Sequence, residues 1–478
     1  MTNITIAWIA LPFFLGFLIY LLPQLDRYLS LGVALVSLGY GLQIFFNESP
    51  LTLQLLDNFG VTLVVDQLSG YFILTNALVM TAVILYCWPT DKKAFFYIQM
   101  IILHGSVNSA FICEDFISLY VALEVIGIAA FLLIAYTRSN RSIWVALRYM
   151  FVSNTAMLFY LVGVVLVYQA NHSFAFAGLR NAPTEAIALI FVGLLTKGGI
   201  FVSGLWLPLT HSESETPVSA MLSGVVVKTG VFPLVRCALI VEEIDPIVRI
   251  FGLGTMFLGV VYGIFEKDTK RMLALSTISQ LGWILVAPGV AGFYALAHGL
   301  AKSALFLIAG NLPSRKFQEL QDQPTNTPIW IALVIASLSI SGFPLLIGFG
   351  AKMLTLKNVL PWQAIVMNFA AVGTTIVFAK FIFLPHKAQE EQGKLKSGFW
   401  AAVTLLIGGL FVVNVVYFEA YTVENIIKAL ATIGMGWLAY FLIFRHSAIK
   451  LPRVMEQLEH LIGVMSLVLL LLLGMILA

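Results

Sequence analysis

Charged side chains are scarce in this chain. Aspartate, glutamate, lysine and arginine make up 11% of its 478 residues, whereas about 25% is usual in soluble proteins. No polar stretch is long enough to form a separate soluble domain, which excludes an ordinary soluble globular protein. The formal net charge is only +3, so the composition gives no support for a nucleic-acid partner.

Cysteine is also rare. The three cysteines, Cys87, Cys113 and Cys237, lie far apart in apolar sequence and form neither a CxxC pair nor a metal-ligand spacing. We therefore expect three buried apolar side chains, with no metal site and no iron–sulfur cluster. The chain also lacks a GxGxxG motif after a strand, and it shows no strand pattern, so we expect no cofactor.

Long apolar runs are abundant instead. Hydrophobic residues make up 60% of the chain, and runs of about 20 residues, enough for a helix to cross a bilayer, recur from end to end. We predict an all-α polytopic membrane protein. Its candidate spans, about sixteen in number, lie near residues 5–22, 28–46, 66–88, 94–113, 115–136, 144–168, 185–208, 217–240, 246–265, 272–290, 292–312, 328–357, 362–384, 398–418, 424–444 and 456–478.

Lysine and arginine are concentrated in alternate connections between these spans. The basic connections read LDRY, TDKK, TRSNR, EKDTKR, PSRKF, HKAQEEQGKLK and RHSAIKLPR. The other connections contain few basic residues, Arg180, Arg249 and Lys357, and are often acidic, as in CED and VEEID. The positive-inside rule therefore predicts that the basic side is cytoplasmic and the N-terminus non-cytoplasmic.

Four lysines lie near the middle of apolar runs: Lys197, Lys228, Lys302 and Lys352. An ionised lysine at the centre of a bilayer costs roughly 2.5–3.5 kcal/mol. Glu124, within ISLYVALEVIGIAAFLL, is the one obvious carboxylate at a similar depth, so permanent ion pairs cannot account for all four amines. A lysine and a glutamate that are buried side by side favour their charged forms. When the two separate, desolvation favours the neutral forms, so such groups take up and release protons. We therefore predict a proton relay.

Two further residues extend this hypothesis. His298 and Lys302 are four residues apart and share one face of a helix, which favours a relay role for the histidine. Arg236 follows Lys228 by two turns, roughly 12 Å along a helix. The sequence leaves open whether it biases Lys228 towards the neutral amine or pairs with a neighbouring acidic residue, Glu242 or Glu243.

Helix-breaking residues adjoin two of the lysines. In LLTKGGIF, Gly198 and Gly199 follow the first lysine, and in SGFPLLIGFGAK, Gly342 and Pro344 precede the last. Interrupted spans line ion paths in transporters, because unwound backbone is tolerated beside a hydrated cavity. The run 328–357 is also too long for one straight helix, so we expect a break within it.

Several stretches carry a family resemblance. They are VDQLSGYFILTNALV, LEVIGIAAFLL, WLPLTHSESETPVSAMLSGVVVKTGVFPLVR, EKDTKRMLALSTISQLGWIL, HGLAKSALFLIAG and SISGFPLLIGFGAK, in this order. They resemble the antiporter-like membrane subunits shared by Mrp-type cation/proton antiporters and respiratory complex I, including NADH-quinone oxidoreductase chains of the M, N and L type. The stretch KTGVFPLVR looks most like the D subunit of the Mrp type.

The resemblance implies an architecture of about 14 core transmembrane helices, in two inverted five-helix repeats with broken helices. One or two extra C-terminal spans would follow the core. On this basis the organisation would be N-terminal helices, a first repeat, a second repeat and C-terminal helices, over residues 1–93, 94–240, 246–384 and 385–478.

The resemblance also implies residue roles. By position, Glu124 is similar to the glutamate of the first half-channel, Lys197 to its paired lysine, and Lys228 to the central lysine. Lys352 is similar to the terminal lysine, and the connecting relay would be His298 and Lys302. Asp66 and Arg236 would be modulating residues.

One motif departs from the family pattern. HSESETP replaces the usual His-x-Glu-Ala-Pro-Thr-Pro, and Val202 and Gly204 stand where the family often has a proline and a histidine. We expect His211 and Glu213 to replace that histidine in proton uptake from the cytoplasmic side.

The function implied is proton translocation within a multi-subunit assembly, as a Na⁺/H⁺ antiporter of Mrp type. The alternative is a proton-pumping subunit of a complex I-like NAD(P)H– or ferredoxin–quinone oxidoreductase or a related hydrogenase; a membrane scaffold with unused charges is a third reading. The expected partners are other subunits of the assembly, protons, Na⁺ and the bilayer of a prokaryotic plasma membrane or a thylakoid or organellar membrane.

Overall fold

The computed structural model describes residues 2–477 except 48, 57–59, 389–396 and 448. Helices make up most of the described chain, and twelve of them are long and apolar enough to cross a membrane. The predicted class, an all-α polytopic membrane protein, is therefore confirmed. Other helices, which are not among these twelve, pack against them: α2, α4, α12 and the pair α15–α16. The predicted number of spans therefore stays a prediction.

The N-terminal part packs four long helices together and adds a hairpin. Its elements are α1 (Thr2–Leu21), η1 (Pro23–Leu25), α2 (Asp26–Ile44), β1 (Leu51–Leu56), β2 (Gly60–Val65), α3 (Gln67–Cys87) and α4 (Ala94–Ala110), where η marks a short 3₁₀ or π segment. The antiparallel hairpin β1–β2, in which Leu53 pairs with Leu63, was not expected from the sequence.

The next part contains the first broken helix. It consists of α5 (Phe116–Ile134), α6 (Asn140–Asn171), η3 (Phe176–Asn181), α7 (Thr184–Lys197), η4 (Phe201–Gly204), α8 (Leu207–Glu213), α9 (Thr216–Met221), η5 (Leu222–Val226) and α10 (Lys228–Ile240). The side chains of Asp115 and Ser139 accept hydrogen bonds from the first turns of α5 and α6 and so fix where these helices begin.

The third part contains the second broken helix. It consists of η6 (Glu242–Ile244), α11 (Asp245–Phe265), α12 (Thr269–Val286), η7 (Pro288–Val290), α13 (Ala291–Ala309), α14 (Phe317–Asp322), β3 (Thr325–Asn326), α15 (Thr327–Ser341), α16 (Ile347–Lys357), α17 (Pro361–Ile382) and β4 (His386–Lys387). The strands β3 and β4 form one short parallel pair.

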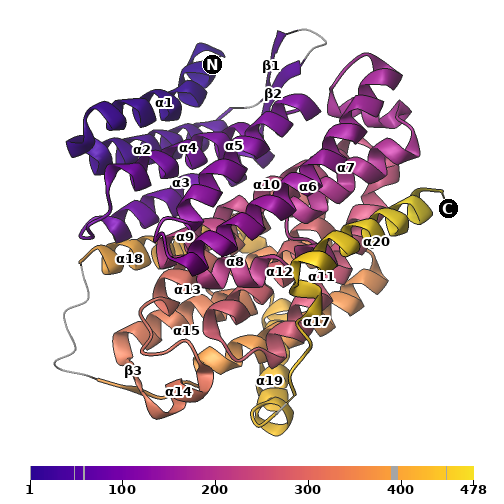
Figure 1. Cartoon of the computed structure of the whole chain (residues 1–478). Coiled ribbons are helices and arrows are strands. Elements are labelled where there is room, and N and C mark those ends of the chain that lie inside the picture. The colour runs from indigo at the N-terminus through magenta and orange to yellow at the C-terminus, as the bar shows by residue number, and fades with distance from the viewer. Residues whose placement is uncertain (1, 48, 57–59, 389–396, 448, 478) are drawn as a thin grey trace.

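The C-terminal part returns to the earlier helices. It consists of α18 (Ser397–Val412), η8 (Val413–Ala420), α19 (Val423–Ala439), η9 (Tyr440–Phe444), η10 (Val454–Glu456) and α20 (Leu458–Leu477). Helix α18 packs against α3 and α13, and α20 packs against α6 and α7 (Figure 1). The spans that include α10 and α13 are completely buried, whereas α1, α19 and α20 lie at the periphery.

Ion pairs and hydrogen bonds join the basic connections to one another. Arg27 donates to the carbonyls of Trp88 and Thr90, Lys92 pairs with Glu215, and Arg315 pairs with both Glu213 and Asp268. We call this end of the bundle the basic face. The other end, where Arg236 pairs with Asp66 and Arg249 with Asp245, is the acidic face. The predicted alternation of connections is thus present among the described residues; residues 389–396 of the connection HKAQEEQGKLK lie outside them.

Candidate functional site

Lys197 is the last residue of α7, and the helix break follows it at once. Gly199 has φ +70°, a left-handed conformation that glycine adopts without strain. The lysine side chain is buried, and its Nζ donates to Ser153 Oγ of α6 at 2.6 Å. Trp206 closes the break from the other side, because its Nε1 donates to the carbonyl of Thr196.

Glu124 lies on the neighbouring helix α5. The Lys197 amine lies 3.2 Å from the position that a Cβ on Gly127 would take, and Gly127 follows Glu124 by three residues on the same helix face. Glu124 Oε1 is buried and has no hydrogen-bond partner. The described residues contain no ion pair between Glu124 and Lys197 within 4.0 Å, so the two groups face each other without direct contact.

Lys228 begins α10 and is completely buried. Its Nζ donates to the carbonyl of Gly224, within the π-helical segment η5 that precedes it. Segments of this kind widen a helix by one residue and occur often at functional sites. The amine also lies 3.6 Å from the position of a Cβ on Gly299, so the absence of a side chain there brings Lys228 close to α13.

His298 and Lys302 lie one turn apart on α13 and are both fully buried. Neither ring nitrogen of His298 has a hydrogen-bond partner, and a cavity of about 10 Å³ adjoins the ring. This is about the space of one water molecule, and Gln280, Ser339 and Gly348 line it. Lys302 Nζ donates to the carbonyl of Leu273 at 3.0 Å and lies 5.1 Å from the centre of the Phe378 ring.

Lys352 follows the second helix break. Helix α15 ends at Ser341, Gly342 has φ +86°, and α16 resumes at Ile347. The buried Nζ of Lys352 donates to the carbonyl of Ser341 at 3.2 Å and lies 5.2 Å from the centre of the Trp283 ring.

A cavity of about 520 Å³ reaches Lys352. Its lining includes Trp283 and, from the C-terminal part, Glu419, Glu424 and Lys428. Lys357 also lines it, and Lys357 lies in one of the sparsely basic connections, so the cavity opens towards the acidic face.

The four amines share one kind of partner. Each donates to a neutral oxygen, a hydroxyl or a backbone carbonyl, and the described residues place no carboxylate within 4.0 Å of any of them. A neutral oxygen accepts a hydrogen bond from either the ammonium or the amine. The arrangement therefore tolerates both protonation states and does not lock the charge in place.

Arg236 does not pair with either of the neighbouring acidic residues that the sequence offered, and its effect on Lys228 stays a prediction. Its guanidinium binds Asp66, with Nη2 to Oδ1 at 2.8 Å, and its Nε lies 3.4 Å from Glu114 Oε2. Pairing with Glu242 or Glu243 is therefore wrong, because the exposed pair lies beyond the end of α10, whereas the Arg236 side chain turns inward to the start of α3.

His211 and Glu213 occupy different environments although they lie on one short helix. His211 is completely buried beside the Trp206 and Phe306 rings, and neither of its nitrogens has a hydrogen-bond partner. Glu213 lies on the basic face, where it pairs with Arg141 and Arg315. The structure thus separates the two predicted uptake residues, one at the surface and one inside.

Sequence reasoning missed the acceptors of the amines and one acidic residue. Ser153 is a single hydroxyl in an apolar run, and the carbonyls of Gly224, Leu273 and Ser341 carry no sequence signal. Glu114 was seen only as part of an acidic connection. Its place beside Arg236 depends on contacts between distant segments.

The chain was compared with known proteins. Residues 113–378, more than half of the chain, match the family described as NADH:quinone oxidoreductase/Mrp antiporter, TM. The D subunit of the Na(+)/H(+) antiporter of Alkalihalophilus pseudofirmus is 28% identical over 448 residues, which cover 83% of this chain and 90% of that protein. The N subunit of the NADH-quinone oxidoreductase of Desulforudis audaxviator is 29% identical over 360 residues, 68% of this chain and 72% of that protein.

Two solved structures share the fold. A chain of an archaeal membrane-bound sulfane sulfur reductase has a TM-score of 0.77 at 22% identity, covering 91% of this chain and 99% of its own. A chain of the Mrp complex from a Dietzia species has a TM-score of 0.74 at 19% identity, covering 97% and 100%. With its buried lysines, its two broken helices and the family match, the chain belongs to the NADH:quinone oxidoreductase/Mrp antiporter transmembrane family.

Proposed function

We propose that this chain is the proton-conducting subunit of a multi-subunit Na⁺/H⁺ antiporter of Mrp type. One observation carries the proposal: titratable side chains run from Glu124 past two helix breaks to Lys352, and each of the four buried amines rests on a neutral acceptor. Retaining four buried amines without ion pairs is costly, and proton exchange is the use that explains them.

In the first half, Glu124 and Lys197 form the loading pair. When the carboxylate and the ammonium approach, each stabilises the charge of the other, and when they separate, desolvation favours the neutral forms. Ser153 holds the Lys197 amine at the end of α7, while Glu124 Oε1 remains free to take up a proton. Lys228 then receives the proton at the contact between α10 and α13.

In the second half, the proton passes from Lys228 along α13 to Lys352. Gly299 brings the Lys228 amine next to His298, whose two ring nitrogens are free to accept and donate in turn. Lys302 lies one turn further, and the cavity beside His298 touches Ser339 and Gly348, which flank the second break. The larger cavity at Lys352 offers a way out to the acidic face.

We place the basic face in the cytoplasm and the N-terminus on the opposite side, following the distribution of lysine and arginine. A prokaryotic plasma membrane is the expected location. We further propose that residues 94–240 and 246–384 are two inverted repeats, because each contains one broken helix with a lysine at the break.

A second function has its own support. The 29% identity to the N subunit of a NADH-quinone oxidoreductase favours a proton-pumping subunit in a complex I-like assembly. The two functions share the proton path and differ in partners. Co-purification with iron–sulfur and quinone-site subunits would favour the second, and co-purification with small antiporter subunits would favour the first.

The test uses the complete complex that contains this chain, reconstituted in proteoliposomes. Proton movement driven by a Na⁺ gradient is measured for Glu124→Gln, for Lys228→Ala and for Lys316→Ala. Lys316 is a matched control, because it is exposed and paired with Glu319 on the surface of the basic face. We expect the first two changes to abolish antiport and the third to leave it unchanged. Antiport at the wild-type rate in Lys228→Ala would contradict the proposal.

A further inference from the structure

A second group of charged residues lies at the acidic face, around Arg236 of α10. Lys228, Phe232 and Arg236 follow one another at four-residue intervals on one side of this helix. Arg236 binds both carboxylate oxygens of Asp66 and approaches Glu114 to 3.4 Å. None of the steps described above uses Glu114. Helix α10 nevertheless connects it to the central lysine, because Arg236 of this helix contacts Glu114 and Lys228 is the first residue of the same helix.

The two carboxylates that share Arg236 differ in their protonation. Burial alone would raise the pKa of Asp66, but the Arg236 guanidinium and the hydrogen bonds from Ser69 outweigh it and hold this pKa below the ordinary value. Burial raises the pKa of Glu114, Arg236 offsets only part of that rise, and the charges of Asp66 and Asp115 add to it. Glu114 is therefore the member of the pair that binds a proton more readily.

The backbone of Glu114 is fixed, whereas its side-chain oxygen Oε2 faces Arg236 at 3.4 Å without a hydrogen bond. Its amide donates to the carbonyl of Thr62 in β2 at 2.8 Å, and its carbonyl accepts from Phe176 at 3.0 Å. Glu114 Oε2 is buried and makes no hydrogen bond. The hairpin β1–β2 thus holds this carboxylate in place and leaves it an open position for a proton.

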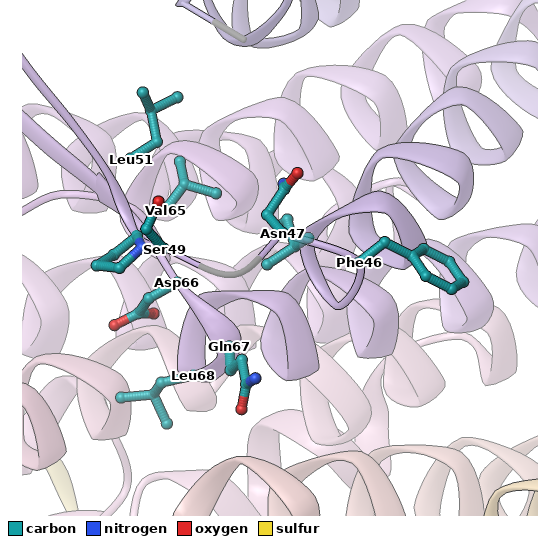
Figure 2. A pocket seen from close by; sticks show the side chains of 10 residues that line it. Phe46, Asn47, Ser49, Leu51, Val65, Asp66, Gln67 and Leu68 are labelled. Atoms are coloured by element: carbon teal, nitrogen blue, oxygen red, sulfur yellow. The ribbon is translucent and has the colours of Figure 1, made fainter.

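A cavity at the acidic face reaches Asp66, the carboxylate that shares Arg236 with Glu114. A cavity of about 610 Å³ opens beside Asp66 and is lined by Asn47, Ser49, Val65 and Gln67, among others. Figure 2 shows the Asp66 carboxylate at its wall, between the end of β2 and the start of α3. Asp66 therefore faces the solution, and the Glu114 side chain beside the same guanidinium is 20% exposed.

Three aromatic rings pack together beside this cluster, and one of them, Phe232, lies between Lys228 and Arg236 on α10. The centres of the Phe72, Phe111 and Phe232 rings lie 5.0–5.5 Å from one another, and all three side chains are completely buried. The Arg236 guanidinium lies 5.2 Å from the Phe232 ring. Pro233 has no amide hydrogen, so the carbonyl of Thr229 lacks its usual helical hydrogen bond. This carbonyl is therefore an available acceptor next to Lys228.

We propose that Glu114 is a further proton-transfer residue, which exchanges protons between Lys228 and the solution at the acidic face. In each transfer a proton leaves the Lys228 ammonium, giving the neutral amine, and binds the Glu114 carboxylate, giving the neutral acid, which then releases it to water. The Phe72–Phe111–Phe232 cluster is the gate, because water has to enter between the rings for a proton to pass. The inference rests on the proposed function and adds to it a second opening, in the first half of the chain.

The test compares Glu114→Gln, Glu114→Asp and the control Glu242→Gln in the reconstituted complete complex. Glu242 is an exposed carboxylate just beyond the end of α10. The transport rate is measured while the pH is varied on each side of the membrane separately. We expect Glu114→Gln to lower the rate several-fold and to remove its dependence on the pH at the acidic face only. Glu114→Asp should restore most of the rate with a shifted profile, and Glu242→Gln should match the wild type.

A wild-type pH profile in an assembled Glu114→Gln complex would overturn the inference. If that variant does not assemble, Glu114→Asp is the test. An unshifted pH profile of transport in Glu114→Asp would also overturn the inference. Lys228→Ala separates the two proposals. Normal transport in Lys228→Ala refutes the proposed function itself, whereas lost transport there combined with a wild-type profile in Glu114→Gln refutes only the role of Glu114.

Discussion

At the scale of single residues, the choice of partner determines what a buried lysine can do. A buried ion pair is stable only as a pair, and removing one partner typically costs 3–5 kcal/mol. The four buried lysines described above avoid that constraint, because a serine hydroxyl or a backbone carbonyl accepts their hydrogen bond. Each amine can lose its proton and keep its place.

The contact between Lys197 and Ser153 gives a testable prediction. Ser153→Ala removes the acceptor at 2.6 Å, and a hydrogen bond to a charged group contributes about 1.5–3 kcal/mol. We expect antiport to fall by about tenfold, since 1.36 kcal/mol corresponds to a factor of ten in rate. Thr155→Ala is the control, because that exposed hydroxyl bonds only the carbonyl of Phe151 in its own helix. Equal rates in the two variants would show that Ser153 does not position the amine.

The sequence identified the buried charges better than their surroundings. Lys228 stands out because a lysine in SGVVVKTGVF has a large insertion cost. Its acceptor, the Gly224 carbonyl, depends on a π-helical segment that no residue pattern announces.

At the scale of elements, the two broken helices place a lysine at each break. Lys197 ends α7, whereas Lys352 lies one turn inside α16 and reaches back to the end of α15. Glycine and proline marked both positions in the sequence. The hairpin β1–β2 escaped notice, because a six-residue apolar strand has too little periodicity to be told from a helix segment.

The second break gives a prediction of its own. Gly342→Ala puts a side chain at φ +86° and brings its Cβ to 2.9 Å from Lys352 Cδ. A left-handed alanine costs roughly 1–2 kcal/mol, and the contact displaces the lysine. We expect a lower melting temperature in detergent and at least a tenfold loss of antiport. Gly408→Ala in α18 is the matched control, since nothing lies within 4 Å of the new Cβ. An active Gly342→Ala complex would argue that the geometry of the break is unimportant.

At the scale of the whole molecule, the C-terminal part ties the two halves together. Arg271 pairs with Glu266 at 3.1 Å and with Glu456 at 2.7 Å, which fixes the segment before α20 to the basic face. Burial would raise the pKa of Glu266, but Arg271 and Arg453 outweigh it and hold this pKa below its ordinary value. Helix α20 then lies against α7, beside the first break. The sequence predicted this extra span but not where it packs, because its partners are distant in the chain.

The central claim is that the buried amines transfer protons and do not merely carry charge. Lys228→Arg tests this most directly, because arginine keeps the positive charge but does not release its proton in proteins. The measurement is Na⁺-driven proton transport by the reconstituted complex with Lys228→Arg and Lys228→Ala side by side. We predict that both variants lose transport to the same extent. Wild-type transport with arginine at position 228 would contradict the account.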